Sequence, residues 1–188
     1  GNDIRMGDVV DHNDSDERAA DFADEMKGSR TLDEQSCAPG RMGSITVAAE
    51  KQNKAVSDLL ARSNRLGKNP KNTNFAGGNT SAKGTGIDPV TGKATNLLWV
   101  KGSGGDLGTL TESGLAVLAL DRVRALVEIY PGVEREDEMV AAFDFCLHGK
   151  GGAAPSIDTA MHALVDANHV DHLHPDSGIA IATAKDGK

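Results

Sequence analysis

The sequence predicts one domain of the α/β or α+β class, preceded by a polar N-terminal segment. Three observations support this prediction: a helical apolar pattern over residues 48–67, a short apolar run at 95–100, and alternation of such segments with glycine-rich loops without internal repeats. At 188 residues the chain can bury a core without disulfides or metal ions as cross-links.

The N-terminal segment is acidic. Residues 1–36 hold eleven Asp and Glu against four Lys and Arg, a net charge of −7 out of −8 for the whole chain. Residues 1–44 carry too few large apolar side chains to offset the entropy of ordering them. We therefore predict a flexible acidic leader at 1–44, with a short helix at 16–27, and a folded domain at 45–188.

The first elements of the domain can be assigned from side-chain spacing. Val56, Leu59, Leu60 and Leu66 recur at helical intervals with Ser63 on the same face, and Gly67 is well placed to end the helix. The run 95–100 is typical of a buried strand.

The later elements follow from caps and periodicity. Thr111 can cap a long helix whose apolar stripe runs through Ala116, Leu120, Val123, Val127 and Tyr130. We expect further helices at 135–149 and after Ser156, and then strands at 168–174 and 178–184.

Composition narrows the function classes. The net charge of −8 disfavours nucleic acid as a partner. The sequence shows neither an apolar run of the ~20 residues that a membrane helix needs nor a signal-peptide pattern, which predicts a cytoplasmic protein without a membrane partner. Cys37 and Cys146 lie far apart, as free thiols of a reducing compartment would.

Three loops carry the groups that bind anions. They are Gly77–Ser81 followed by Lys83, Lys101–Gly105, and Ala154–Asp158. Glycines allow close backbone approach, and successive amides or a helix start can hold an anion. None fits the phosphate loop of nucleotide hydrolases or the dinucleotide fingerprint. Each loop alone is typical of a plain turn, but together they favour one composite pocket.

The segment 169–176, HVDHLHPD, holds half of the six histidines. Strand alternation places His172 and His174 on one face and His169 on the other. The pair is compatible with a metal site, a pH-sensitive loop or a coincidence. Asp158 could return to the histidines as a metal ligand or general base, or be a first-turn charge favoured by the helix dipole. His148 and His162 are interpreted as surface or helix-packing residues.

These motifs, in the order GGNTS, KGSGGDL, PSID and HVDHLHP, resemble the class II aldolase/adducin superfamily over about residues 50–188. The phrases at 62–84 and 97–107 are most similar to the aldolase half of bifunctional rhamnulose-phosphate aldolase/alcohol dehydrogenases. The resemblance implies a three-layer α/β/α domain with a mixed, largely antiparallel central sheet.

The resemblance also implies roles for individual residues. Substrate phosphate would be held by Gly78, Asn79, Ser103, Gly104 and Ser156, with Ile157 standing where the family has a second serine. Asp158 matches the family's acid/base residue, usually a glutamate, which also contacts the metal. His172 and His174 match two histidine ligands of Zn²⁺ or another divalent metal.

The implied activity is a zinc-dependent lyase that cleaves a ketose 1-phosphate, such as rhamnulose 1-phosphate, into dihydroxyacetone phosphate and a small aldehyde. Two alternatives stay open: a pentulose-phosphate epimerase, and a non-catalytic, adducin-like binding or oligomerisation module. Homo-tetramers are typical of the family. Its third histidine ligand lies downstream of the pair, and no histidine follows His174 before Lys188. We therefore expect this chain to be the N-terminal portion of the domain.

Overall fold

The computed structural model describes the backbone of residues 39–187 and the side chains of residue 52 and residues 54–187. Its centre is a five-stranded sheet in the order β4-β3-β2-β1-β5, in which every neighbouring pair is antiparallel. The strands are β1 (Asn79–Ile87), β2 (Ala94–Lys101), β3 (Leu115–Ala119), β4 (Leu147–Gly152) and β5 (His169–His172). The α-helices are α2 (Pro39–Gly67), α3 (Leu120–Ala125), α4 (Glu136–Ala142), α5 (Thr159–Leu164) and α6 (Asp176–Thr183).

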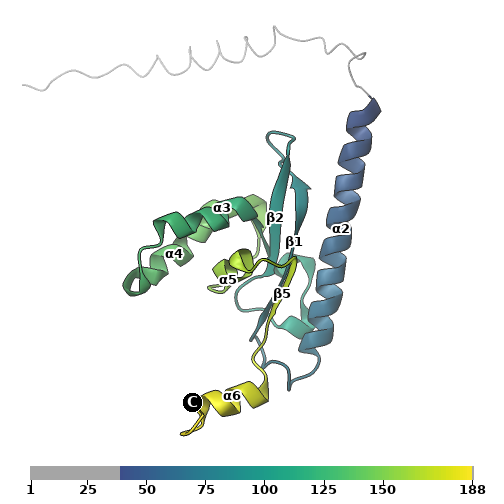
Figure 1. Ribbon diagram of the computed structural model, residues 1–188. Helices are drawn as coiled ribbons and strands as arrows, with labels where there is room; N and C mark the ends of the chain where they lie inside the picture. Colours follow the sequence, from purple (N-terminus) through teal and green to yellow (C-terminus); the bar gives the residue numbers. More distant parts are fainter. Residues whose placement is uncertain (1–38, 188) are drawn as a thin grey trace, which may run out of the picture. The chain divides into compact units, whose positions relative to one another are not determined.

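Helices cover both faces of the sheet, which makes three layers (Figure 1). Directly paired residues of antiparallel strands share a face, so Ala82 and Trp99 lie on the face that contacts α2. There they pack with Leu59, which is fully buried. The core of this layer comprises Val56, Leu59, Ala82, Leu97, Trp99, Leu107, Leu110 and Leu115.

The opposite face is covered by α3, α4 and α5. Ser81, Val100 and Val170 are paired across β1, β2 and β5 and therefore point to this side. Its core comprises Leu98, Val100, Ala116, Leu118, Leu120, Val123, Phe143, Cys146 and Ala163. The three-layer fold predicted from the sequence is confirmed, with a sheet that is antiparallel throughout the described residues.

Several predicted elements are confirmed. The helix at 48–67 is the C-terminal part of α2, which ends at Gly67, and Val56, Leu59 and Ser63 are buried on it. Ser63 also forms a hydroxyl–hydroxyl hydrogen bond of 2.6 Å with Thr80. The strand at 95–100 is β2, of which the last five residues are buried.

The long helix predicted from Thr111 to Tyr130 is wrong. Its first half is β3, and only Leu120–Ala125 forms an α-helix. The run Leu115–Leu120 is apolar because successive side chains of β3 point into the two cores in turn: Ala116 and Leu118 into one, Leu115 into the other. Such a run suits a central strand as well as a buried helix, and periodicity cannot separate the two.

Three further predictions are corrected. The strand predicted at 178–184 is α6, which begins after the extended Pro175 and leaves Ile181 62% exposed. Part of the loop predicted at Gly77–Ser81 and Lys83 is strand, since β1 begins at Asn79. The helix predicted at 135–149 ends earlier, since a 3₁₀ turn follows α4 and β4 starts at Leu147.

The N-terminal predictions fall largely outside the described residues. The helix at 16–27, Cys37 and most of the leader lie there, while α2 already begins at Pro39. Across the described part of the chain, no helix is long and apolar enough to span a membrane.

Candidate functional site

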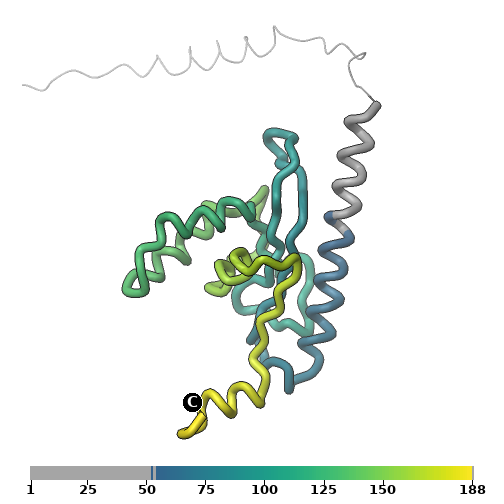
Figure 2. Tube along the Cα trace, in the orientation of Figure 1, coloured from purple at the N-terminus to yellow at the C-terminus, as the bar shows by residue number. Residues whose placement is uncertain are grey.

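The pairing of the first and last strands brings the two best motifs together. Asn79 opens β1 and lies directly opposite His172, the last residue of β5. Figure 2 shows the C-terminal part of the chain that contains β5 running beside the β1 segment. The two residues therefore share the face of the sheet that also contacts α5. Residues 93 positions apart in the chain become neighbours in this way.

His172 and His174 lie close together, as predicted, but not for the predicted reason. β5 ends at His172, so strand alternation does not orient His174. The two rings nevertheless meet edge to face, with centroids 4.8 Å apart and planes at 72°. Nδ1 of His174 lies 3.2 Å from Oδ1 of Asn74. His169 points to the opposite face, as expected, and its Nδ1 lies 3.2 Å from an Arg62 nitrogen.

Asp158 reaches the histidines from the turn that precedes α5. Its Oδ1 lies 3.7 Å from Nδ1 of His172, and both side chains are 29% exposed. Its Oδ2 accepts a hydrogen bond of 3.1 Å from the Ser156 hydroxyl. Ser156 Oγ also accepts the backbone amide of Asp158 at 3.1 Å. This local turn aims the carboxylate at β5.

The loops at Gly77–Ser81 and Lys101–Gly105 are also connected to this group by hydrogen bonds. Asn79 donates from Nδ2 to the carbonyl of Lys101 at 2.9 Å. The amide of Ser103 donates to the carbonyl of Ala154 at 3.0 Å. A Cβ on Gly102 would lie 2.5 Å from the Cβ of Ala153, so this glycine permits the close approach of the two loops. The three predicted loops and the histidine segment thus form one cluster.

The residues expected to bind phosphate differ in burial and in how many of their polar groups are already hydrogen-bonded. Gly78 and Gly104 have positive φ angles of 71° and 80°, which favour glycine. Asn79 and Ser156 are buried and engaged in the hydrogen bonds described above, whereas Ser103 is exposed. Ile157 points elsewhere: together with Ala160 and Leu164 it lines an apolar cavity of about 300 Å³ beside α3 and α4.

Two buried basic side chains border the cluster. Lys101 is only 2% exposed, and its Nζ has one long contact of 3.4 Å, to the carbonyl of Gly102. Burial lowers the pKa of Lys101, while the charges of Asp106 and Asp158 oppose this shift. Its ammonium group therefore has donors to spare next to the glycine-rich loop.

The second buried basic side chain is His162. The sequence indicated a surface or packing role for it, and the structure shows that it is fully buried. It lies one helical turn after Asp158, and its Nδ1 is 2.8 Å from the hydroxyl of Ser81 on β1. Burial lowers the pKa of His162 to about 4, partly opposed by Asp158. The histidine is thus neutral at physiological pH and joins α5 to the sheet.

The chemistry of the donors suits a divalent metal, although the set is short. Two imidazoles and a carboxylate are ordinary zinc ligands. Nδ1 of His172 is buried and has no hydrogen-bond partner, which is unusual for a ring nitrogen that serves only packing. Among the described side chains, those of residues 52 and 54–187, however, no group of three acidic, histidine or cysteine residues is arranged to hold a metal ion.

Comparisons with known proteins agree with the motifs. Residues 57–188 match the family described as the class II aldolase and adducin N-terminal domain. The chain is 39% identical over 135 residues to an uncharacterized oxidoreductase, YuxG, of Bacillus subtilis. That match covers 72% of the chain but only 19% of the relative, so the chain spans about a fifth of its length. The N-terminal class II aldolase domain of a conserved Thermoplasma acidophilum protein superposes with a TM-score of 0.62 at 28% identity, covering 69% of this chain and 59% of that one.

Proposed function

The chain belongs to the class II aldolase and adducin family, and on this premise we propose that it is a metal-dependent aldolase acting on a sugar phosphate. The observation that carries the proposal is the meeting of His172, His174 and Asp158 beside the glycine-rich loops. The substrate class we propose is a ketose 1-phosphate such as rhamnulose 1-phosphate, cleaved to dihydroxyacetone phosphate and a small aldehyde.

Metal binding is assigned to His172 and His174, with Asp158 as a carboxylate ligand. A divalent cation such as Zn²⁺, when bound, supplies a Lewis acid that polarises a carbonyl oxygen. The two histidines come from the end of β5 and the residues after it, so their spacing depends on how that segment is held against β1.

Asp158 is the group that holds or moves a proton. Its Oδ2 is fixed by the Ser156 hydroxyl, and its Oδ1 faces the imidazole of His172. A carboxylate at 29% exposure can accept a proton from a bound hydroxyl. Aspartate is one methylene shorter than the glutamate usual in the family, and its hydrogen bonds with Ser156 hold the carboxylate facing His172.

Phosphate binding is assigned to the loops on either side of Lys101. The residues assigned are Gly78, Asn79, Ser103, Gly104 and Ser156. Their loops are supported by the hydrogen bonds from Asn79 to Lys101, from the Ser103 amide to Ala154, and from Ser156 to Asp158. The spare donors of the buried Lys101 add a positive charge there. A charge-assisted hydrogen bond from a buried cation is stronger than one between neutral groups.

The proposal is tested by metal content and retro-aldol cleavage. We expect the chain to bind one divalent ion. The metal-loaded chain should then release dihydroxyacetone phosphate from a ketose 1-phosphate. His172→Ala should lose the bound metal, whereas His148→Ala, a partly exposed histidine on β4, should keep it. Unchanged metal content in His172→Ala would refute the assignment of the site.

One observation favours a second candidate, a non-catalytic binding or oligomerisation module of the adducin type. The part of the chain that the structure describes offers fewer than three arranged metal ligands, whereas catalytic zinc normally has three protein ligands and an open position. A folded chain that binds no metal and cleaves no sugar phosphate, yet self-associates, would support this candidate over the enzyme.

A further inference from the structure

His174 owes its position to a turn in the connection between α2 and β1. Since β5 ends at His172, no strand hydrogen bond of the described sheet fixes His174. The only side-chain hydrogen-bond partner of its imidazole among the described residues is Asn74, whose Oδ1 lies 3.2 Å from Nδ1. A residue of the connection between α2 and β1 therefore holds the imidazole of His174, the second histidine of the pair.

The turn is shaped to make this contact. The amide of Gly77 donates to the carbonyl of Asn74 at 3.0 Å, which closes a four-residue turn. Ala76 within it has a φ of 59°, a left-handed conformation that alanine rarely adopts and that costs of order 1 kcal/mol. Such strain persists where the surrounding structure requires the conformation.

Glycines in the same turn leave room for the histidine segment. A Cβ on Gly77 would lie 2.1 Å from Oδ1 of Asn74 and 2.8 Å from Nδ1 of His174. A Cβ on Gly78 would lie 2.8 Å from the carbonyl oxygen of His172. Gly77 is thus required by the Asn74–His174 contact itself. A turn that only connected α2 to β1 would not need a glycine at this position.

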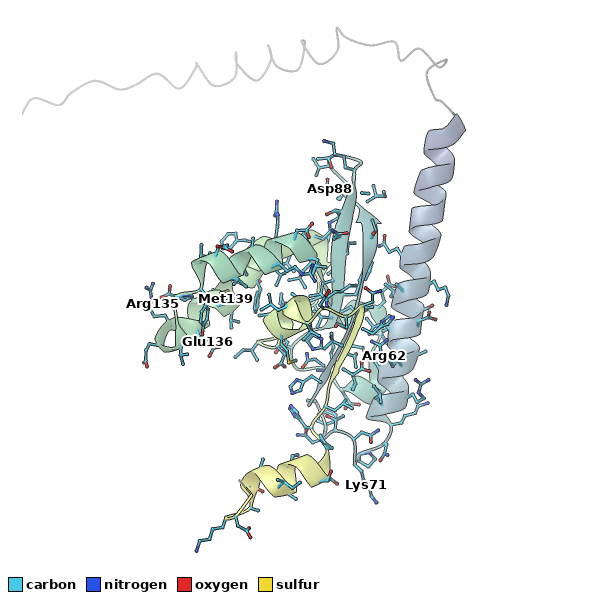
Figure 3. The ribbon with its side chains drawn as sticks, in the orientation of Figure 1. Arg62, Lys71, Asp88, Arg135, Glu136 and Met139 are labelled. Carbon is cyan, nitrogen blue, oxygen red and sulfur yellow. The ribbon has the colours of Figure 1, made fainter. Side chains whose placement is uncertain are left out.

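A third contact holds the same two segments together. The amide of Asp176 donates to the carbonyl of Lys71 at 3.1 Å, just beyond His174 (Figure 3 labels Lys71). The histidine segment is therefore held against the connection at three successive places, near Gly78, at Asn74 and at Lys71. Of these contacts, only the one at Asn74 reaches an imidazole.

We propose that Asn74 is a positioning residue that fixes the ring orientation and tautomer of His174, an inference that rests on the proposed metal site. An amide oxygen facing Nδ1 requires a proton there, so the lone pair lies on Nε2, the nitrogen left free to bind a metal. Ligating histidines commonly donate their other N–H to an oxygen in this way, and loss of that oxygen weakens metal affinity about 10–100-fold. Gly77 supports the same contact by leaving space for the amide group.

The first test measures the dissociation constant of Zn²⁺, by competition with a chromogenic chelator, in the full chain. Asn74→Ala should bind about 10–100-fold more weakly. Asn74→Asp keeps an oxygen acceptor at the same reach and should restore the affinity of the original chain or exceed it. Asn168→Ala, an exposed asparagine next to β5, should change nothing. Equal affinities in Asn74→Ala and the original chain would overturn the proposal.

The second test needs no metal. Nitrogen chemical shifts of the His174 ring, recorded on the metal-free chain at alkaline pH, report which nitrogen carries the proton. We expect the Nδ1–H tautomer in the original chain and in Asn74→Asp, and a mixture in Asn74→Ala and Gly77→Ala. A mixture already present in the original chain would refute the role of Asn74.

The two tests separate the inference from the proposed function. If the original chain binds no Zn²⁺ but shows a fixed tautomer that Asn74→Ala releases, the positioning role stands and the metal assignment fails. If Zn²⁺ binds equally well in Asn74→Ala and the tautomer is unchanged, the metal assignment stands and the inference fails. Circular dichroism melting of each variant distinguishes either result from loss of folding.

Discussion

The polar side chains on the two faces of β5 differ in whether they have hydrogen-bond partners. On the face toward α2, Arg62 donates to Asp171 at 2.9 Å and to the carbonyl of Ser81 at 2.7 Å, and it lies 3.2 Å from His169 (Figure 3). On the other face, Nδ1 of His172 is buried without a hydrogen-bond partner and lies 3.7 Å from Asp158. Asp171 and His172 are consecutive residues, so a single strand carries both arrangements.

The difference separates a structural cluster from a candidate binding site. Buried polar groups are nearly always paired, since an unpaired one costs about 1–3 kcal/mol. The cluster around Arg62 meets this rule and fastens β5 to α2. The face with His172 leaves hydrogen-bonding capacity unused, as expected where a ligand completes the set. Charge alone does not make the distinction, because each face carries one aspartate and at least one histidine.

Acid should destabilise the fold through the buried His162, which contacts Ser81 on the face of the sheet toward α5, and this is the largest effect we expect. The pKa of His162 is lowered to about 4 in the folded chain, against about 6.5 when unfolded. Between these values the unfolded chain binds a proton that the folded chain does not. Stability is therefore complete above pH 6.5 and falls by up to about 3 kcal/mol as the pH drops to 4.

Chemical denaturation at a series of pH values measures this effect. His162→Gln removes the titrating group while keeping a polar side chain toward Ser81. The pH dependence of its unfolding free energy should be shallower than that of the original chain between pH 4 and 6.5. Parallel profiles for the two proteins would contradict the assignment.

Removing Arg62 should break the cluster that fastens β5 to α2. Arg62→Met leaves Asp171 and the carbonyl of Ser81 without their donor, at a side chain that is only 17% exposed. We expect a loss of about 2 kcal/mol in the free energy of unfolding. The matched control is Arg65→Met, an exposed arginine in the last turn of the same helix, for which a few tenths of a kcal/mol is expected. Urea unfolding curves that coincide for the two variants would be inconsistent with this role.

Replacement by asparagine should affect stability at Asp171 and metal affinity at Asp158. Asp171→Asn weakens an ion pair that is 33% exposed and should cost about 1 kcal/mol of stability without altering Zn²⁺ affinity. Asp158→Asn should weaken Zn²⁺ binding while changing stability by less than about 0.5 kcal/mol. Metal titration and thermal melting of both variants check the contrast. If Asp171→Asn lowered metal affinity more than Asp158→Asn, the division between the two faces would be wrong.

The sequence predicted the candidate site better than it predicted the elements that carry it. The order of the motifs placed Asn79, Ser103, Asp158 and the histidines in one pocket, and the contacts among their loops bring them together. Their metal and substrate roles remain predictions. Side-chain chemistry survives errors in secondary structure, since a short polar motif keeps its donors whether it lies in a loop or at the end of a strand.

The errors in the fold have physical causes. β3 resembled part of a helix because helices cover both faces of the sheet, so its side chains are apolar on both faces. β1 resembled a loop because small residues fill it, and Gly84 and Gly86 lie against Trp99 and Leu97 of β2. Asn74 could have been suspected only from the pattern Asn-x-x-Gly-Gly, which is typical of a turn. The partner of that turn lies 100 residues later and cannot be deduced from local sequence.

The strand order also determines when the candidate site can exist during folding. β1 and β2 are joined by the six residues between Ile87 and Ala94, a turn in which Asp88 Oδ1 accepts bonds from Val90 and Thr91. β1 and β5 instead close a loop of about ninety residues, which by polymer statistics costs about 2 kcal/mol more entropy. The hairpin can form from local contacts alone, whereas pairing of His172 with Asn79 closes a loop that contains every element from β2 to α5. The candidate site therefore depends on the pairing with the longest loop closure in the described sheet, which carries the largest entropic cost.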